Sequence, residues 1–486
     1  MAELHKIFGF IPEVRKPAEK KLDFNTKLKW TLIILVSFFV LANIPLFGLT
    51  ENALARFEYL AIILGTDFGS IISLGIGPIV MASIILQLLS GSGIINIDIT
   101  TEEGKKFFTG IQKILVFFFI LFEALIYVLM QGLQAGPGLA WLVILQLILG
   151  GLAIFYMDEV TQKWGFGSGV SLFIGAGVSW RLLASAFQFI NQQGKNCLLD
   201  FSNTACSGKV FVFIQSIINK APIEAYSALG AILATIIIFL IVVWAQNLKV
   251  EIPLSFGRLR GYGIKWPLAF FYASVIPVIL VAALTANIQL FGGMLENAAQ
   301  PCFSDGVLNR SIEACSGSAR IASHFGWLGS FVNGQPISGL SFWIGSTNLL
   351  DLVIRGGFRT IFLWQGIIHT IFFIVFCTVF SVFWVKTSGM DARAQAGKIS
   401  ASGLQVSGFR QDNRILESIL DRYIIPLTVM GGAAIGFLAS ITNLLGALVS
   451  GTAMLLVIMI MFQFYQNIAQ QHATDMNPAL RKFIEG

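Results

Sequence analysis

Charged residues are scarce in this 486-residue chain, where Asp, Glu, Lys and Arg make up only 12%, against about 25% in a typical soluble domain. Hydrophobic residues reach 56% and the mean hydropathy is +0.78. This composition excludes a water-soluble fold. The formal net charge of +6 is modest, so nucleic-acid binding is not expected to be the whole function.

Cysteine and histidine are also scarce, with five and four copies. Neither Cys-x-x-Cys nor His-Glu-x-x-His occurs, so we expect no metal site and no cofactor. A Gly-x4-Gly-Lys-Ser/Thr loop is missing too, which indicates that the chain is not its own ATP motor. No cleavable signal peptide is visible, because the first 28 residues are charged and the first apolar run is followed by many more.

Long apolar runs fill most of the chain. A membrane-spanning helix needs about 20 mostly apolar residues, and ten runs of about that length are present. Their approximate bounds are 29–48, 68–90, 110–132, 138–157, 168–191, 226–248, 264–292, 360–386, 422–443 and 449–467. The sequence therefore predicts an all-α polytopic membrane protein with ten transmembrane helices.

The basic residues lie mostly on one side of these spans. With the amino terminus in the cytoplasm, most of the 32 Lys and Arg fall in cytoplasmic segments, so the positive-inside rule favours two cytoplasmic termini. Ten spans with this topology divide as five plus five, and the second five must be inverted relative to the first, as in channels or transporters with inverted repeats.

The predicted organisation follows from the spans and loop lengths. It comprises a cytoplasmic amphipathic segment 1–28, an amino-terminal half 29–191, an outer loop 192–225, a carboxy-terminal half 226–467 with cytoplasmic loops 247–265 and 387–421 and an outer loop 293–359, and a cytoplasmic tail 468–486.

Ionisable groups inside the spans are few, although carriers and pumps usually need them. Away from the span ends they are Glu123, Arg181 and His369, and Asn287 is the main polar amide of the seventh span. For Glu123 and Asn287, a buried polar pair or an edge contact explains the residues as well as a functional role does. His369 is better interpreted as an interior histidine than as a ligand.

Two pairs of bulky aliphatic residues stand four apart beside glycines. Ile76 and Val80 form one pair, and Val170 and Ile174 form the other, so each pair shares a helical face. Such a face can line a hydrophobic constriction that excludes water and ions. Taken alone, ordinary packing or lipid-facing positions are the simpler interpretation.

A shorter apolar stretch at 53–65 contains Arg56 and Glu58 and cannot cross the bilayer. It is expected either to fold back and stop a pore or to lie on the membrane as an interfacial helix.

The cysteines also fall into loops: Cys197 and Cys206 share one outer loop, and Cys302 and Cys315 share the other. An oxidising exterior permits one disulfide within each loop, and the alternative is reduced thiols.

Six motifs, in order along the chain, resemble the SecY protein-translocation channel family, above all its archaeal branch, which is similar to the eukaryotic alpha subunit. They are LGIGPIV at 74–80, GFGSGV at 165–170, VEIPL at 250–254, IPVIL at 276–280, ANIQL at 286–290 and PLTVM at 426–430. The resemblance runs from about residue 10 to the end. It implies two inverted halves, 1–5 and 6–10 in helix number, around an hourglass pore with a plug helix.

The resemblance also implies roles for individual residues. The implied pore ring consists of Ile76 and Val80 on span 2, Val170 and Ile174 on span 5, Ile279 on span 7 and Leu438 on span 10. The implied plug is the helix 53–65, with Leu54, Arg56, Phe57, Leu60 and Ile63. The lateral gate is implied to contain a polar cluster with Glu123 and Asn287, and its third member, usually a small hydroxyl residue, is Met81 here.

Partners are implied as well. They are a SecE-type gamma subunit, a small beta subunit, a ribosome or cytoplasmic motor, signal sequences, nascent polypeptides and membrane lipid. Arg258, Arg260 and Arg410 match basic positions that face the ribosome, where guanidinium groups suit ribosomal RNA phosphates. By the same resemblance, the outer region 293–359 is longer than is usual in the family, and no role is assigned to it.

The expected function is a passive protein-conducting channel of the plasma membrane, without enzyme activity, that moves unfolded polypeptide outward and releases apolar segments into lipid. The alternative from another class is a secondary transporter with an inverted repeat, which predicts ion-binding polar groups near the midplane. A membrane enzyme ranks third, because it requires clustered Asp, His or Glu within the spans.

Overall fold

Helices dominate the computed structural model. It describes residues 12–18, 22–52, 68–91, 94, 101–130, 132–191, 195–197, 205–256, 263–273, 276–299, 303–304, 307–308, 323–332, 335–401, 404–406, 413–449 and 451–476. Ten helices correspond to the ten expected spans. They are α2 (Phe24–Ala42), α4 (Gly77–Gly91), α5 (Glu102–Leu129), α6 (Ala140–Trp164), α7 (Gly169–Phe187), α9 (Pro222–Gln246), α10 (Ile276–Ala299), α14 (Thr360–Thr387), α16 (Asn413–Leu445) and α17 (Gly451–Met476).

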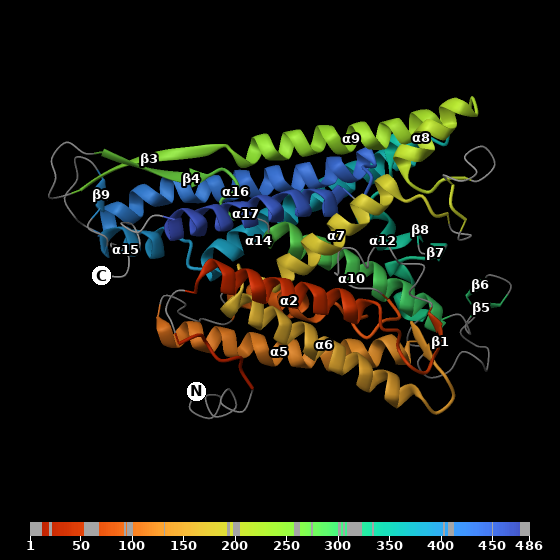
Figure 1. The fold of residues 1–486 in the computed structure, drawn as a ribbon, viewed down its shortest axis with the longest axis horizontal. Helices are drawn as coiled ribbons and strands as arrows, with labels where there is room; N and C mark the ends of the chain where they lie inside the picture. Colours follow the sequence, from red (N-terminus) through yellow and green to blue (C-terminus); the bar gives the residue numbers. More distant parts are fainter. Residues whose placement is uncertain are drawn as a thin grey trace.

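The long helices lie roughly along one direction, with the short elements gathered at the two ends (Figure 1). In the described ranges, nine helices are long and apolar enough to cross a membrane. The tenth, α4, has only 15 residues. One continuous apolar core joins α2, α4, α5, α6, α7, α9, α10, α14, α16 and α17. Many leucines, isoleucines and phenylalanines on the outer helix faces are exposed, as expected of surfaces that contact lipid.

The second span differs from the expectation of a helix over 68–90, because α4 begins only at Gly77. Residues 71–76 form turns, and Gly75 has a φ of +55°, a left-handed conformation that favours glycine. Pro78 then fits the first turn of α4, where its missing N–H costs nothing. The turn segment lies directly against α6, since a Cβ on Gly150 would stand 1.9 Å from the Ile71 carbonyl oxygen.

The seventh span also differs, because the predicted run 264–292 contains a strand followed by a helix. β4 (Gly263–Ala269) pairs antiparallel with β3 (Lys249–Phe256), and β9 (Leu404–Val406) pairs with the other edge of β3. Ile252 and Leu268 are buried in a second, smaller core with α15 (Ala392–Ala401) and the start of α16. The apolar residues at 264–269 therefore serve a sheet at one end of the molecule (Figure 1), and α10 starts at Ile276.

The same end of the molecule is tied together by Tyr272, whose hydroxyl donates a hydrogen bond of 2.7 Å to the Met390 carbonyl oxygen. Burial raises the pKa of this phenol to about 12, and the nearby Asp391 carboxylate adds to the effect. The sheet, α15 and the start of α16 thus form one packed unit from the two loops that were expected to be cytoplasmic.

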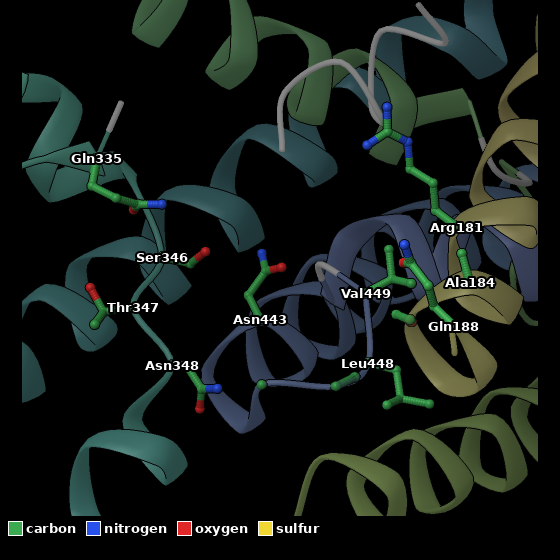
Figure 2. Close-up of a pocket in the computed structure, with 13 residues that line it drawn as sticks. Arg181, Ala184, Gln188, Gln335, Ser346, Thr347, Asn348, Asn443, Leu448 and Val449 are labelled. Atoms are coloured by element: carbon green, nitrogen blue, oxygen red, sulfur yellow. The ribbon is translucent and has the colours of Figure 1, made fainter. Parts of the chain in front are cut away.

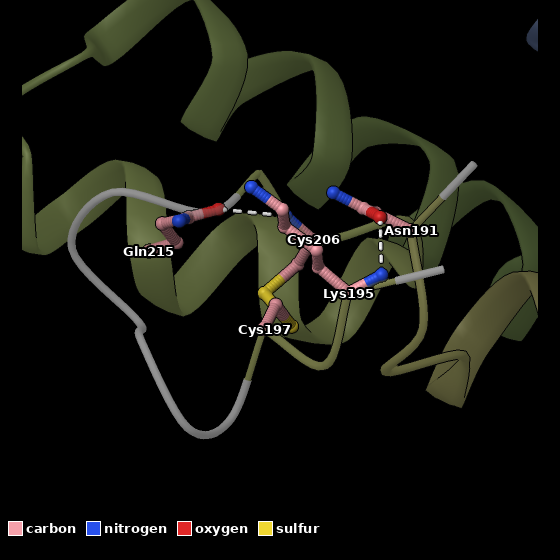
Figure 3. Close-up of a disulfide and its surroundings, with 5 residues drawn as sticks. All are labelled: Asn191, Lys195, Cys197, Cys206 and Gln215. Carbon is pink, nitrogen blue, oxygen red and sulfur yellow. Dashed lines mark hydrogen bonds between the residues drawn. A yellow bond between two sulfur atoms is a disulfide. The ribbon is translucent and has the colours of Figure 1, made fainter. Parts of the chain in front are cut away.

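The opposite end carries the short elements of the two outer loops and a two-stranded sheet from the connections after the first and third spans. They are β1 (Leu49–Asn52), β2 (Leu133–Ala135), α8 (Lys209–Ile218), β5 (Phe303–Ser304), β6 (Val307–Leu308), η3 (Ser323–Leu328), β7 (Phe331–Val332), β8 (Gln335–Pro336), α12 (Gly339–Ile344) and α13 (Leu349–Ile354). A disulfide joins Cys197 to Cys206, the bridge expected within the first outer loop (Figure 3).

Polar side chains of α10 and α14 dock the second outer loop. Gln365 donates to the Phe342 carbonyl oxygen at 2.7 Å, and His369 Nδ1 lies 2.7 Å from the Ile344 carbonyl oxygen. Glu296 accepts a hydrogen bond from the Phe331 N–H at 2.9 Å. His369 is therefore an interior histidine with a structural partner, as interpreted from the sequence.

Candidate pore and lateral gate

Four of the expected ring residues lie in the apolar core where the two halves meet. Ile76, Val80, Ile174 and Ile279 are at most 4% exposed and belong to one contiguous cluster. Val170 is half-buried against the same cluster. Ile76 directly precedes α4, and the helices meet around this point, because α4 packs against α10, and α17 packs against both α7 and α10.

Leu438 does not lie on the tenth span. It belongs to α16, the ninth, whereas the tenth span is α17. The expectation is wrong because Leu438 falls within the ninth apolar run, 422–443, and α16 ends only at Leu445. α17 instead brings Ile460 against α7: its Cγ2 lies 3.1 Å from where a Cβ of Gly175 would stand.

Leu456 is the residue of α17 that suits the ring best. It lies one turn before Ile460 and therefore shares its helical face, and it is fully buried in the same core cluster. Ile174 directly precedes Gly175, the residue of α7 that faces Ile460. The sequence motifs did not reveal Leu456, because every residue from Ala453 to Ile460 is buried and apolar.

Glu123 of α5 is 1% exposed, and neither of its carboxylate oxygens has a hydrogen-bond partner among the described residues. Its Oε2 lies 3.0 Å from where a Cβ of Gly77 would stand. Gly77 is the first residue of α4, so the carboxylate lies beside a helix amino terminus, where negative charge is favoured. Only glycine leaves space for this approach.

Asn287 of α10 is 2% exposed and donates to the Ala283 carbonyl oxygen in its own helix at 2.9 Å. Its Oδ1 has no partner in the described part of the chain. Glu123 lies where α5 meets α4, and Asn287 is buried in α10, which also packs against α4, but no hydrogen bond joins the two side chains. The polar contact expected between the two side chains is therefore not formed among the described residues.

A polar cavity of about 580 Å³ opens at the end of the molecule that carries the outer loops. Figure 2 shows amide and hydroxyl side chains around it, from the end of α7, the segment after α12 and the end of α16. Its polar lining residues are Arg181, Ser185, Gln188, Gln335, Ser346, Thr347, Asn348 and Asn443, and none of the described lining residues is a carboxylate. Such a lining offers hydrogen bonds to any polypeptide backbone.

The other end of α6 carries charged groups, because α6 continues to Trp164 beyond the expected limit of 157. Glu159 accepts hydrogen bonds from Lys113 at 2.8 Å and Lys163 at 3.1 Å. Glu13 pairs with Lys163 at 2.7 Å, and the Val14 N–H donates to Glu159. This network ties residues 12–18, named here the amino-terminal strap, to α5 and α6.

Acid is expected to release the strap. The hydrogen bond from Lys163 lowers the pKa of Glu13 from its ordinary value of 4.5. A carboxyl with a depressed pKa stabilises the bound state at higher pH and loses that contribution as the pH falls through its folded-state pKa. A spin label at Ala18→Cys should become mobile below about pH 4.5. Glu13→Gln should be mobile already at neutral pH and Lys16→Gln should not; mobility that is independent of pH contradicts the assignment.

Several expected site residues lie outside the described residues. They are the plug 53–65 with Leu54, Arg56, Phe57, Leu60 and Ile63, the basic residues Arg258, Arg260 and Arg410, and the cysteines Cys302 and Cys315.

Comparison with known proteins identifies relatives of this chain in sequence and in structure. The SecY family model matches residues 70–465. A protein translocase subunit SecY from Methanothermobacter thermautotrophicus is 40% identical over 484 residues, covering 98% of this chain and 97% of the relative. Two solved structures, each 35% identical, cover 98% of this chain and are themselves covered to 99%. One is a SecY protein whose plug domain is described as stabilising the closed translocation channel and maintaining a membrane seal, with a TM-score of 0.76. The other is Sec61 in a canine ribosome–channel complex from the endoplasmic reticulum, with a TM-score of 0.74.

These matches confirm the predicted fold class, an all-α polytopic membrane protein with ten membrane helices in two inverted halves. The match to this relative covers nearly the whole chain. The chain therefore belongs to the SecY family.

Proposed function

We propose that this chain is the channel-forming subunit of a Sec protein translocase. It acts as a passive conduit, not an enzyme: unfolded polypeptide passes between the halves, and apolar segments leave sideways into lipid. The observation that carries the proposal is the buried aliphatic cluster at the meeting point of α4, α7, α10 and α17, with a polar cavity at the outer-loop end.

The proposed ring consists of Ile76, Val80, Val170, Ile174 and Ile279 together with Leu456. Aliphatic side chains make no directional bonds, so they can deform around a polypeptide of any sequence. When the chain has passed, the constriction closes and dewets, which excludes ions. The amide-lined cavity beyond it gives the emerging backbone polar partners at once.

The lateral gate is proposed at the junction of α4, α5 and α10. Glu123 and Asn287 each bury an acceptor without a donor, and unmade hydrogen bonds of buried groups cost about 1–3 kcal/mol each. These unmade hydrogen bonds lower the free energy needed to separate the helices at this junction. A signal sequence entering between α4 and α10 could separate these helices without first breaking a hydrogen bond between the two side chains.

Deleting residues 53–65, the proposed plug, is expected to make the closed channel leak ions. The ring alone then has to seal a pore that two barriers sealed before, so ion flux into proteoliposomes should rise several-fold. A secondary transporter altered at the same place should instead lose coupled solute uptake and show no leak. Flux that stays at the wild-type level would remove the plug from the proposal.

Docking of a ribosome is proposed at the end of the molecule that carries the β3–β4–β9 sheet. This sheet and α15 form one packed unit, and Arg258, Arg260 and Arg410 belong to its two loops by sequence. A SecE-type subunit and a small beta subunit are proposed to complete the complex. Because ribosomes are cytoplasmic, this end of the molecule is proposed to face the cytoplasm. Both termini are then also cytoplasmic, and the membrane is proposed to be the plasma membrane.

Reversing the charge of Arg258, Arg260 and Arg410 together is expected to weaken ribosome binding at least about tenfold at low salt. The reason is the loss of three phosphate contacts, each of which contributes to the salt-dependent affinity. Co-sedimentation across a salt series measures this, with Lys105, Lys106 and Lys398 reversed as the control. Unaltered binding, with an unaltered salt slope, would exclude these arginines from the docking surface.

A further inference from the structure

The corner between α8 and α9 presents apolar side chains outward. The two helices pack against each other, and Figure 1 shows α8 beside the outer-loop end of α9. Ile214, Ile217 and Ile218 of α8 and Tyr226 of α9 are 44–64% exposed. Because α9 crosses the membrane and begins at Pro222, this corner lies at the level where lipid headgroups meet acyl chains.

The orientation of α8 is fixed by the loop before it. The N–H of Cys206, which is disulfide-bonded to Cys197, donates to Oε1 of the buried Gln215 at 3.1 Å (Figure 3). Gly208 fits tightly against the end of α7, because a Cβ there would stand 2.7 Å from the Gln188 nitrogen. With Gln215 and Ser216 turned inward, the isoleucines of α8 must face outward.

A groove of about 540 Å³ runs between the two helices at this corner. Phe213, Ile217, Ala225 and Leu229 supply apolar walls, and Lys220 and Tyr226 line it as well. Lys220 is exposed, and within the described residues no carboxylate lies within ion-pair distance of its ammonium. The nearest acid along α9, Glu224, is engaged by Arg355 of α13 at 3.7 Å.

Lys220 has a backbone conformation that lysine does not favour. Its φ is +53°, and no other described non-glycine residue has a positive φ. It occupies the position after the carboxy-terminal cap of α8, since the Lys220 N–H donates to the Ile217 carbonyl and the Ala221 N–H to the Ser216 carbonyl. Glycine or asparagine is the usual residue in this motif. A side chain that strains its own backbone points to a use for the ammonium group.

We propose that this corner is a binding site for an anionic phospholipid. One acyl chain lies in the groove between α8 and α9, and the headgroup phosphate contacts the Lys220 ammonium, with the Tyr226 hydroxyl as a second donor. A lysine and an aromatic residue at the rim of an apolar groove suit such a lipid when the groove lies at the membrane boundary. The site anchors the disulfide-closed loop to the membrane, away from the pore and the gate, and so adds to the proposed function without depending on it.

Photolabelling tests the site directly. The full chain, isolated with the subunits that copurify with it, is mixed with phosphatidylglycerol or phosphatidylcholine carrying a photoreactive acyl chain, and the labelled peptides are mapped. Phosphatidylglycerol should label residues 205–229 about fivefold more than phosphatidylcholine, the preference that one well-placed lysine provides. Excess inorganic phosphate should not compete, because the acyl chain supplies much of the affinity.

Matched variants separate the two halves of the site. Lys220→Asn keeps a residue that tolerates positive φ and removes the ammonium, so the preference for phosphatidylglycerol should vanish; Lys195→Asn, which removes another exposed lysine of the same loop, should retain it. Ala225→Phe fills the groove and should reduce labelling by both lipids. Equal labelling by the two lipids in the wild type, an unchanged preference in Lys220→Asn, competition by phosphate, or shielding of the corner by a copurifying subunit overturns the proposal.

Discussion

Ile174→Asn is expected to make the closed channel permeable to ions. Ile174 is fully buried in the cluster shared by α7, α10 and α17, and an amide there holds water in a constriction that otherwise dewets. Lowering that barrier by about 1.4 kcal/mol raises the flux about tenfold. Ion flux into proteoliposomes measures the leak, and secretion of a client with a weakened signal sequence should rise in parallel.

The control for this variant is Ile154→Asn. Ile154 of α6 is as deeply buried as Ile174 and belongs to the same continuous core, but it is not among the proposed ring residues. It should lose stability to a similar extent, because both variants bury an amide in an apolar environment, and yet cause no leak. Equal leak from both variants would assign the effect to general loosening of the fold and would count against the ring.

Gly150→Ala is expected to destabilise the amino-terminal half strongly. The added Cβ would stand 1.9 Å from the Ile71 carbonyl oxygen, a backbone atom that cannot turn aside. The turns at 71–76 must then shift away from α6, and Ile76 with them. Overpacking of this kind typically costs about 1–3 kcal/mol, occasionally more, so the midpoint of thermal unfolding should fall by several degrees and the ring should leak.

The same substitution at Gly177 should act in the opposite direction. Nothing lies within 4 Å of the Cβ position at this helical glycine of α7, so alanine adds no clash and restricts the unfolded backbone. Stabilisation of about 0.5–1 kcal/mol is expected. If Gly150→Ala were as stable as Gly177→Ala, the close approach of the 71–76 turns to α6 would be wrong.

Much of the fold can be predicted from the sequence, because a membrane helix requires a run of apolar residues and little else. The exceptions have local causes. At 71–76 the run is apolar but contains Gly75 and precedes Pro78, so turn geometry prevails over hydropathy. At 264–269 a mostly apolar run pairs with the preceding strand β3, which satisfies its backbone hydrogen bonds, so it does not join the helix.

The site was only partly predictable for related reasons. Ile76, Val80 and Ile174 lie in distinctive glycine-containing motifs, whereas Leu456 is surrounded by apolar neighbours that look alike in sequence. Glu123 was identified as an isolated buried charge, but its neighbour, the start of α4 at Gly77, could not be inferred before the position of that helix was known. The Glu159 network was missed because polar residues at a span's end resemble an ordinary loop.

Site-specific crosslinking from position 174 tests the central claim most directly. A photoreactive residue replaces Ile174, and a secretory nascent chain is stalled partway through translocation; the same residue at Ile154 serves as the control. We predict a crosslink from position 174 to the nascent chain that depends on a functional signal sequence, and none from position 154. Absence of any crosslink from position 174, while the chain is being translocated by the same protein, would contradict the assignment of this cluster as the polypeptide-conducting constriction.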